Sequence, residues 1–225
     1  MAVNNLEAGN FETIIWDLDG TLINSFEIFC EVLEETARRN KLAVPDKSAM
    51  FHNFHGSLED SIKHSLGLSD HEPMGALVVD FLKVQEKYYE HPDDHLFADA
   101  LGLAKRAHSA GLRQILVTNR AHADRGNASP RHIVENTQLK GMIGTIVCAD
   151  EVAFRKPDAR VLDGVEFSVS GTLVIGDQFV DAELAHNLGV HAVIADRIGQ
   201  GIAHIDTLPD AANFSVVKSL DEVMV

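Results

Sequence analysis

The sequence predicts an α/β protein in which a parallel sheet is covered by helices on both faces and an α-helical subdomain is inserted early in the chain. Short apolar runs alternate with helical patterns after residue 95, and strands that are apolar on both faces are typical of parallel sheets. Between residues 24 and 90 the pattern is helical without a strand, which indicates an insertion. A chain of 225 residues can bury one substantial core and a smaller subdomain.

The first part of the chain contains one predicted strand, at about residues 12–16, followed by helices. The first helix carries apolar side chains at helical spacing: Phe26, Phe29, Cys30, Leu33 and Ala37. Ser57 predicts the start of a second helix, because its hydroxyl can accept a hydrogen bond from the first turn, and Gly67 predicts its end. Pro73 predicts the start of a third helix.

The second part of the chain alternates helices and strands. Helices are predicted at about residues 99–109 and 180–188, and strands at residues 114–117, 142–148, 172–175 and 191–195. Ligands bind to parallel sheets at the carboxyl ends of the strands. Polar side chains that stand at these ends are therefore candidates for a functional site, and they are Asp17, Asp19, Thr118 and Asp177.

The charge balance limits the classes of partner. The chain has 19 basic and 34 acidic residues, for a net charge of −15. Such a field repels nucleic acid and anionic membranes, and no apolar stretch reaches the roughly 18 residues that a membrane span needs. A small phosphorylated metabolite remains compatible, because a bound divalent metal and one or two lysines can reverse the sign locally.

The cysteines and the N-terminus predict the compartment. Cys30 and Cys148 lie far apart without metal-ligand spacing, which favours reduced, buried thiols. Residues 1–7 contain neither a basic region nor an apolar stretch, so we expect no signal peptide and a cytoplasmic protein. The sequence leaves the oligomeric state open between monomer and dimer.

Asp17 and Asp19 directly follow the first predicted strand and precede Gly20. Residues two apart leave a strand on the same side, so both carboxylates can face one small site. A buried pair of this kind needs a compensating cation, and Mg²⁺ would offset the repulsion between a nucleophilic carboxylate and a phosphate. The second carboxylate could protonate the departing alcohol and then activate water. Two exposed aspartates in a turn are the alternative.

Three further segments fit the same chemistry. Thr118 and Asn119 follow a predicted strand, where a hydroxyl and backbone N–H groups could hold a phosphoryl oxygen. Lys156 could neutralise a carboxylate and a phosphate together. Asp177 could complete a metal site, with Asp181 one helical turn further in its second coordination shell. The alternatives are an ordinary turn, a solvated surface lysine and a helix N-cap, respectively.

Taken in this order, the four segments resemble the four motifs of the haloacid dehalogenase superfamily, and the resemblance extends from Phe11 to the C-terminus. It implies a Rossmann-like core of residues 1–22 and 96–225. The large insertion between the first and second motifs, residues 23–95, resembles the helical cap of the phosphoglycolate phosphatase-like and beta-phosphoglucomutase-like members. Cap movement in such proteins admits substrate and excludes water.

The resemblance also implies roles for the motif residues. Asp17 would be the nucleophile that forms an aspartyl-phosphate, and Asp19 would be the general acid/base. Asp17, the main-chain carbonyl of Asp19 and Asp177 would bind Mg²⁺, with Asp181 supporting the metal or its waters. Lys156 would neutralise charge.

The resemblance implies substrate contacts as well. Gly20, Thr118 and Asn119 would surround the phosphoryl group. The cap loop that contains His55 and Gly56 would contact the leaving group.

Asp19 discriminates within the superfamily, because members that break carbon–halogen bonds lack an aspartate at the matching position. We therefore expect a phosphatase that hydrolyses a small phosphate monoester. A sugar phosphomutase with the same residues and a non-catalytic binding protein on this scaffold stay open as alternatives. The cap loop at residues 50–60 contains no Lys or Arg, which disfavours a second phosphate on the substrate.

Three details of the resemblance stay open. Arg155 competes with Lys156 for the charge-neutralising role. The polar stretch of residues 121–130 is longer than usual and predicts a loop near the site. His91 and His95 suggest either a zinc site or a solvated hinge between cap and core.

Overall fold

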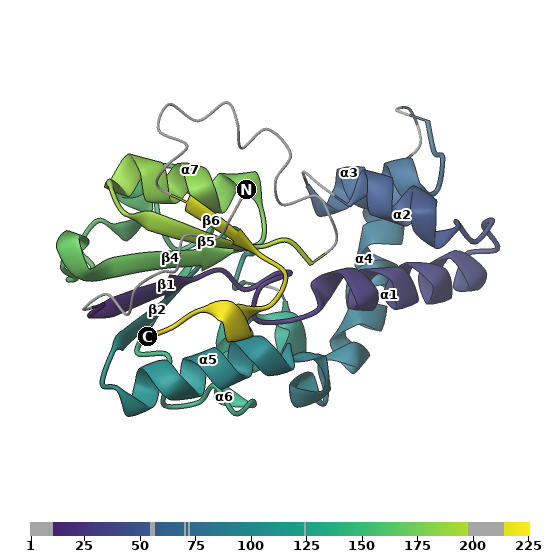
Figure 1. Ribbon diagram of the computed structural model, residues 1–225. Helices are drawn as coiled ribbons and strands as arrows, with labels where there is room; N and C mark the ends of the chain where they lie inside the picture. The colour runs from purple at the N-terminus through teal and green to yellow at the C-terminus, as the bar shows by residue number, and fades with distance from the viewer. Residues whose placement is uncertain (1–10, 55–56, 70, 72, 124, 198–213) are drawn as a thin grey trace.

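The computed structural model describes residues 11–54, 57–69, 71, 73–123, 125–197 and 214–225. These residues form a parallel sheet of six strands in the order β3-β2-β1-β4-β5-β6. Figure 1 labels β2, β1, β4, β5 and β6 in this succession. The strands are β1 (Thr13–Trp16), β2 (Arg113–Thr118), β3 (Thr145–Cys148), β4 (Thr172–Gly176), β5 (His191–Ala195) and β6 (Phe214–Val217). The predicted α/β class with a parallel sheet is confirmed.

The order of the strands determines where a ligand site is expected in the sheet. The chain leaves β1 toward β2 and β3 on one side, and then continues from β4 to β6 on the other. Trp16 lies level with Leu116 on one neighbour and with Ile175 on the other. The segments that directly follow β1, β2 and β4 therefore meet where the direction of winding changes, which is the usual place for a ligand in such a sheet.

Helices cover both faces of the sheet. Alternate residues of β1 point to opposite faces: Ile14 and Trp16 belong to one buried cluster and Ile15 to another. The first cluster packs against α5 (Ala98–Ser109) and α6 (Pro130–Glu135), and the second packs against α7 (Phe179–Leu188). Figure 1 shows these helices on opposite sides of the strands. Burial on both faces explains why the strands read as continuous apolar runs.

Residues 25–88 form a helical segment that lies to one side of the sheet (Figure 1). It contains α1 (Ser25–Arg39), α2 (Lys47–Asn53), α3 (Leu58–Ser65) and α4 (Gly75–Tyr88). Aromatic rings form its centre, with Phe29 packed 4.9 Å from Phe54 and 5.7 Å from Phe81 between ring centroids. Among the described residues, no helix is long and apolar enough to cross a membrane.

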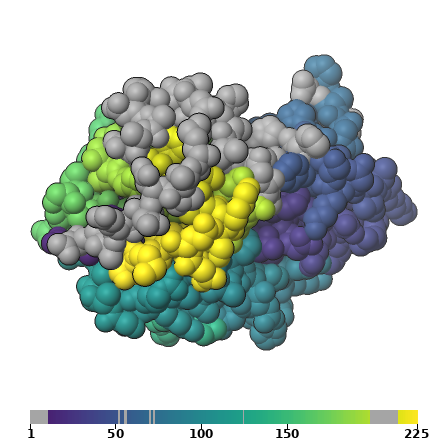
Figure 2. Space-filling model, viewed as in Figure 1, coloured from purple at the N-terminus to yellow at the C-terminus, as the bar shows by residue number. Residues whose placement is uncertain are grey.

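Short 3₁₀ helices complete the described chain: η1 (Pro92–His95), η2 (Gly126–Ala128), η3 (Ala159–Leu162), η4 (Val169–Gly171) and η7 (Leu220–Glu222). The last of these belongs to the C-terminal segment, which lies against α5 and is drawn in yellow in Figure 2. Cys30 and Cys148 are free and buried, as predicted.

The sequence analysis did not identify three elements, namely β6, α2 and α6. β6 is an edge strand whose first three residues are only half buried, so its apolar signal is weak. α2 and α6 have seven and six residues, too few for a helical period to stand out. α6 begins within the polar stretch for which a loop was predicted.

Candidate active site

A cavity of about 420 Å³ lies at the carboxyl ends of β1, β2 and β4, where the helical segment faces the sheet. Acidic and basic side chains from the strand ends line one part of it, and residues of α1, α3 and α4 line another. The predicted candidates that line this cavity are Asp17, Asp19, Thr118, Asn119, Lys156, Asp177 and Asp181. Residues far apart in the chain are thus brought into one site.

Lys156 and two carboxylates form a buried ionic cluster at the floor of the cavity. The Lys156 Nζ donates to Asp17 Oδ1 at 2.5 Å and to Asp181 Oδ1 at 2.7 Å. Burial raises the pKa of Asp17 to about 7, although the Lys156 ammonium opposes the rise. Burial alone would lower the pKa of Lys156, but Asp17 and then Asp181 raise it above its usual value. Arg155, the competing candidate, is exposed and does not line the cavity.

Asp177 adds a third buried carboxylate from the end of β4. Carboxylate oxygens of Asp17, Asp177 and Asp181 all lie within 4.8 Å of one another. Burial, and then repulsion by Asp17, raises the pKa of Asp177 well above its usual range. Lys156 supplies a single positive charge against these three carboxylates, so the cluster favours an additional cation.

The donor set fits a hard divalent cation such as Mg²⁺, which prefers carboxylate oxygens. Both oxygens of Asp181 are already engaged, one by Lys156 and the other by the backbone N–H of Gln178 at 3.2 Å. Asp17 Oδ2 and Asp177 Oδ2 have no hydrogen-bond donor among the described residues. These two oxygens could therefore bind a cation, whereas both oxygens of Asp181 already accept hydrogen bonds from the protein.

Gly20 allows Asp177 to approach the first loop. Its φ of +81° lies in the left-handed region, and a Cβ at this position would stand 2.1 Å from Asp177 Oδ2. The Thr21 hydroxyl donates to Asp177 Oδ1 at 3.4 Å. Gly20 is therefore needed because a side chain at this position would collide with the Asp177 carboxylate, a contact that the sequence motif alone did not reveal.

Asp19 pairs with Arg120, a residue that sequence reasoning missed. The guanidinium contacts both carboxylate oxygens, with Nε 3.1 Å from Oδ2 and a second nitrogen on Oδ1. It also donates to the Tyr89 hydroxyl at 3.0 Å and to the Ala128 carbonyl at 2.8 Å. Tyr89 directly follows α4, so Arg120 links Asp19 to the helical segment. Its position after Thr118 and Asn119 was the only available signal.

Thr118 and Asn119 occupy the end of β2 and the start of its loop. Thr118 is buried, and its hydroxyl accepts a hydrogen bond from the Arg120 backbone N–H at 3.0 Å. The Asn119 side chain binds the Lys156 backbone at both ends: its oxygen accepts at 3.1 Å and its amide donates to the carbonyl at 3.2 Å. Asn119 thus holds the loop that carries Lys156.

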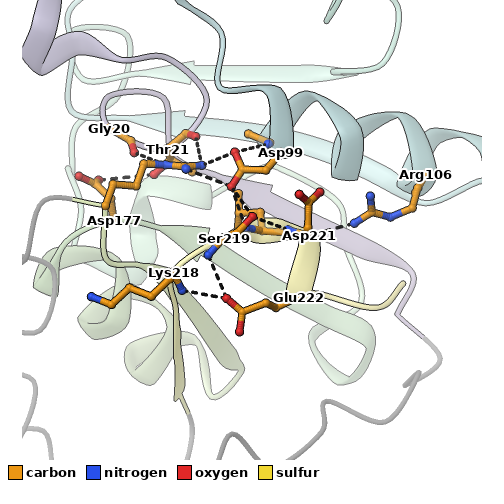
Figure 3. Close-up of polar contacts among 12 residues, drawn as sticks. Gly20, Thr21, Asp99, Arg106, Asp177, Lys218, Ser219, Asp221 and Glu222 are labelled. Carbon is orange, nitrogen blue, oxygen red and sulfur yellow. Dashed lines mark hydrogen bonds and ion pairs between the residues drawn. The ribbon is translucent and has the colours of Figure 1, made fainter.

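A second ionic network connects the loop after β1 to α5 and to the C-terminal segment (Figure 3). Arg197 forms two ion-pair contacts with Asp99, at 2.9 and 3.0 Å, and donates to the carbonyls of Gly20 and Thr21. Asp99 also accepts from the Leu220 backbone N–H at 2.8 Å, which ties the C-terminal segment to the same network. The sequence analysis did not identify this network, because its members belong to four separate segments of the chain.

The remaining predicted candidates differ in what the structure says of them. His55 and Gly56 lie outside the described residues. His95 lies in η1, where its Nε2 contacts the Tyr88 carbonyl at 2.8 Å, and the metal-type cluster found among the described residues includes neither His91 nor His95. Arg125, within the predicted loop of residues 121–130, lines the cavity.

The site is thus a buried acidic cluster at the carboxyl ends of parallel strands, with Lys156 within it and Asp19 lining the same cavity. Residues 14–195 match the family described as haloacid dehalogenase-like hydrolase. This match covers most of the chain, and the chain therefore belongs to that family, as the motifs predicted.

Individual relatives differ in activity. The chain is 26% identical to a phosphoglycolate phosphatase of Rhodospirillum rubrum over 194 residues, which is 81% of this chain and 78% of the relative. It is 24% identical to an (S)-2-haloacid dehalogenase of Pseudomonas putida over 235 aligned positions, with 95% of each chain covered. Among solved structures, CbbY from Rhodobacter sphaeroides in complex with phosphate superimposes with a TM-score of 0.70 at 15% identity, covering 94% of this chain and 96% of that chain.

Proposed function

We propose that the protein is a magnesium-dependent phosphatase that hydrolyses a small phosphate monoester through an aspartyl-phosphate intermediate. The observation that carries this proposal is that two carboxylates of the first loop, Asp17 and Asp19, line the same cavity in different environments. Asp17 lies against Lys156, and Asp19 lies against Arg120. Dehalogenating members of the family lack the second aspartate, so its presence favours phosphate esters over organic halides.

Asp17 is the proposed nucleophile. One of its carboxylate oxygens bonds to phosphorus while the bond from phosphorus to the ester oxygen breaks. Lys156 lies within 2.5 Å of Asp17 and balances charge as the dianionic phosphoryl group approaches. The hydroxyl of Thr118, a buried residue that lines the cavity, would donate to a phosphoryl oxygen.

Asp19 is the proposed general acid and base. In the first step it donates a proton to the departing alcohol oxygen, and in the second step it removes a proton from the water that attacks phosphorus. This second step releases inorganic phosphate and restores Asp17. Arg120 fixes the orientation of the Asp19 carboxylate through two nitrogens, so the proton is exchanged at a defined place in the cavity.

Asp17, Asp177 and the main-chain carbonyl of Asp19 would hold Mg²⁺, with Asp181 behind them. When bound, the ion supplies positive charge that offsets the repulsion between the nucleophilic carboxylate and the phosphate. Residues 23–95 would act as the cap that closes over the cavity and excludes bulk water. Phosphoglycolate is the first candidate substrate, because a relative that aligns with 81% of this chain is named as a phosphoglycolate phosphatase.

The test is phosphate release from a panel of phosphomonoesters, with and without Mg²⁺, together with halide release from a 2-haloacid. We expect Mg²⁺-dependent phosphate release that Asp17→Asn reduces by at least about 1,000-fold, because the nucleophile is removed. Asp163→Asn, an exposed aspartate outside the cavity, is the matched control and should retain activity. Turnover that survives Asp17→Asn would exclude the covalent route. Isomerisation of a sugar phosphate without phosphate release would instead identify a phosphomutase.

A further inference from the structure

Among the described residues that line the cavity, one cationic side chain has no counterion. Arg120 is paired with Asp19, and Lys156 is paired with Asp17 and Asp181. Arg125 also lines the cavity, yet the described part of the chain offers its guanidinium neither a hydrogen bond nor an ion pair. An arginine held partly out of water without a counterion is costly, because it loses hydration and gains no partner.

The electrostatic surroundings of Arg125 add to that cost. Its pKa is lowered, first by burial and then by repulsion from the Arg120 guanidinium. Asp19 and Asp150 act in the opposite direction without overcoming these effects. A ligand anion beside Arg125 would relieve both the desolvation and the repulsion between the two arginines.

Two polar side chains from the helical segment also line this cavity and lack a hydrogen-bond partner within the described ranges. Ser25, at the start of α1, has a buried hydroxyl to which no described group is hydrogen-bonded. Gln85, in α4, is 8% exposed, and none of the described groups bonds to its amide. Buried polar groups are normally hydrogen-bonded, so two unpaired groups and one unpaired cation around a single cavity indicate a polar ligand.

The position of Arg125 is set by packing against the helical segment. The residue directly precedes η2, and the Asn127 side chain donates to the Glu86 carbonyl of α4 at 3.5 Å. Gly126, with φ of +50°, lies so close that a Cβ would stand 2.3 Å from the Glu86 carboxylate. The loop therefore presents Arg125 at the junction of core and helices, beside the strand ends that carry Asp17.

We propose that Arg125, assisted by Gln85 and Ser25, binds a carboxylate on the alcohol part of the substrate. This inference rests on the proposed phosphatase function, because a phosphoryl group placed at Asp17 directs the rest of the substrate toward these side chains. A single guanidinium matches one carboxylate through two hydrogen bonds. A second phosphate would need more positive charge than the described lining residues provide, in keeping with the absence of Lys and Arg from residues 50–60.

The experiment compares three ligands that differ in one group: phosphoglycolate, its neutral counterpart 2-hydroxyethyl phosphate, and ethanediol bisphosphate. Binding is measured by calorimetry with Mg²⁺ on the full-length Asp17→Asn protein, which cannot form the covalent intermediate. We expect phosphoglycolate to bind about 10- to 100-fold more tightly than the neutral ligand, as for hydrogen bonds to a charged group. Adding Arg125→Met should bring this ratio close to one, and Arg125→Lys should retain part of it.

Two further variants sharpen the test. Arg155→Met removes a nearby exposed arginine that does not line the cavity, and it should leave the ratio unchanged. Gln85→Leu should weaken phosphoglycolate binding severalfold, as expected for one lost hydrogen bond. Thermal unfolding of each variant verifies that it is folded before binding is measured.

The proposal is overturned if Arg125→Met leaves the ratio unchanged, if the neutral or bisphosphate ligand binds as tightly as phosphoglycolate, or if none of the three binds. The phosphatase proposal fails separately, if the wild-type protein releases no phosphate from any ester, including p-nitrophenyl phosphate. The ligand ratio still decides the role of Arg125 in that case, because it is measured without turnover.

Discussion

Replacing Asp17 by asparagine should remove much of the pH dependence of stability between pH 5 and 8 in the metal-free protein. Burial raises the pKa of Asp17 to about 7, against an ordinary value of 3.8 in the unfolded chain. Between these values the folded state holds a proton that the unfolded state has lost, so stability falls as the pH rises. With about 1.4 kcal/mol for each pKa unit, the loss between pH 5 and 8 is about 3 kcal/mol.

Urea unfolding in the presence of a chelator measures this effect, with the fluorescence of Trp16, the single and fully buried tryptophan, as the signal. The wild type should lose about 3 kcal/mol more than Asp17→Asn from pH 5 to 8. The substitution also removes the repulsion from Asp17 that raises the pKa of Asp177. The change at Asp177 therefore reduces the pH dependence of stability in the same direction as the loss of Asp17 itself. Added Mg²⁺ should stabilise the wild type more at pH 8 than at pH 5, because the ion binds ionised carboxylates.

Asp150→Asn is the matched control for this experiment. Hydrogen bonds from the backbone N–H groups of His122 and Ala123 lower the pKa of Asp150. A lowered pKa contributes stability that is complete above the unfolded value and is lost only as the pH falls through the folded value. The control should therefore keep the wild-type dependence between pH 5 and 8. Parallel curves for the wild type and Asp17→Asn, within about 0.5 kcal/mol, would refute the reasoning about burial.

Two other substitutions test the site by its stability and its metal. Lys156→Met removes the ammonium that pairs with Asp17 and Asp181, and it should lower the free energy of unfolding by about 3–5 kcal/mol in chelator at pH 8. Adding Asp181→Asn should restore part of this loss in the same urea titrations, and an unchanged unfolding midpoint would contradict the ion-pair account. Gly20→Ala places a Cβ 2.1 Å from Asp177 Oδ2 and should weaken Mg²⁺ binding, followed by thermal shift, at least about tenfold. Gly141→Ala is the control, because Gly141 has a similar φ of +77° but nothing within 4 Å of the added Cβ. This variant should lose only about 1 kcal/mol of stability. Equal Mg²⁺ affinities in the Gly20 and Gly141 variants would exclude crowding of Asp177 by the added Cβ.

Much of the fold could be predicted because its signals are local. The central strands are buried on both faces, so their apolar runs identify them without knowledge of their neighbours. Ser57 accepts the hydrogen bond from Asp60 that its position predicted. The edge strand β6 and the short helices α2 and α6 lack such signals, and only their packing against the rest of the molecule stabilises them.

The candidate site divides in the same way. Asp17 and Asp177 could be placed together from sequence, because both follow buried strands of one parallel sheet. The pairing of Asp19 with Arg120 joins residues 101 positions apart, and the pairing of Arg197 with Asp99 joins residues 98 positions apart. The sequence shows that these four residues are charged, but it does not show which of them form ion pairs with one another.

The sequence by itself determined the parallel sheet, the inserted helices and the set of carboxylates at the strand ends, because periodicity and order along the chain carry that information. Only the tertiary structure decided how the positive charges are shared among them. Lys156 and Arg120 are paired with aspartates of the site, whereas Arg125, which lines the same cavity as Gln85 and Ser25, has no counterion in the part of the chain that the structure describes. Electrostatic pairing depends on distances of a few ångströms and on burial, and both arise only when separate segments of the chain pack together.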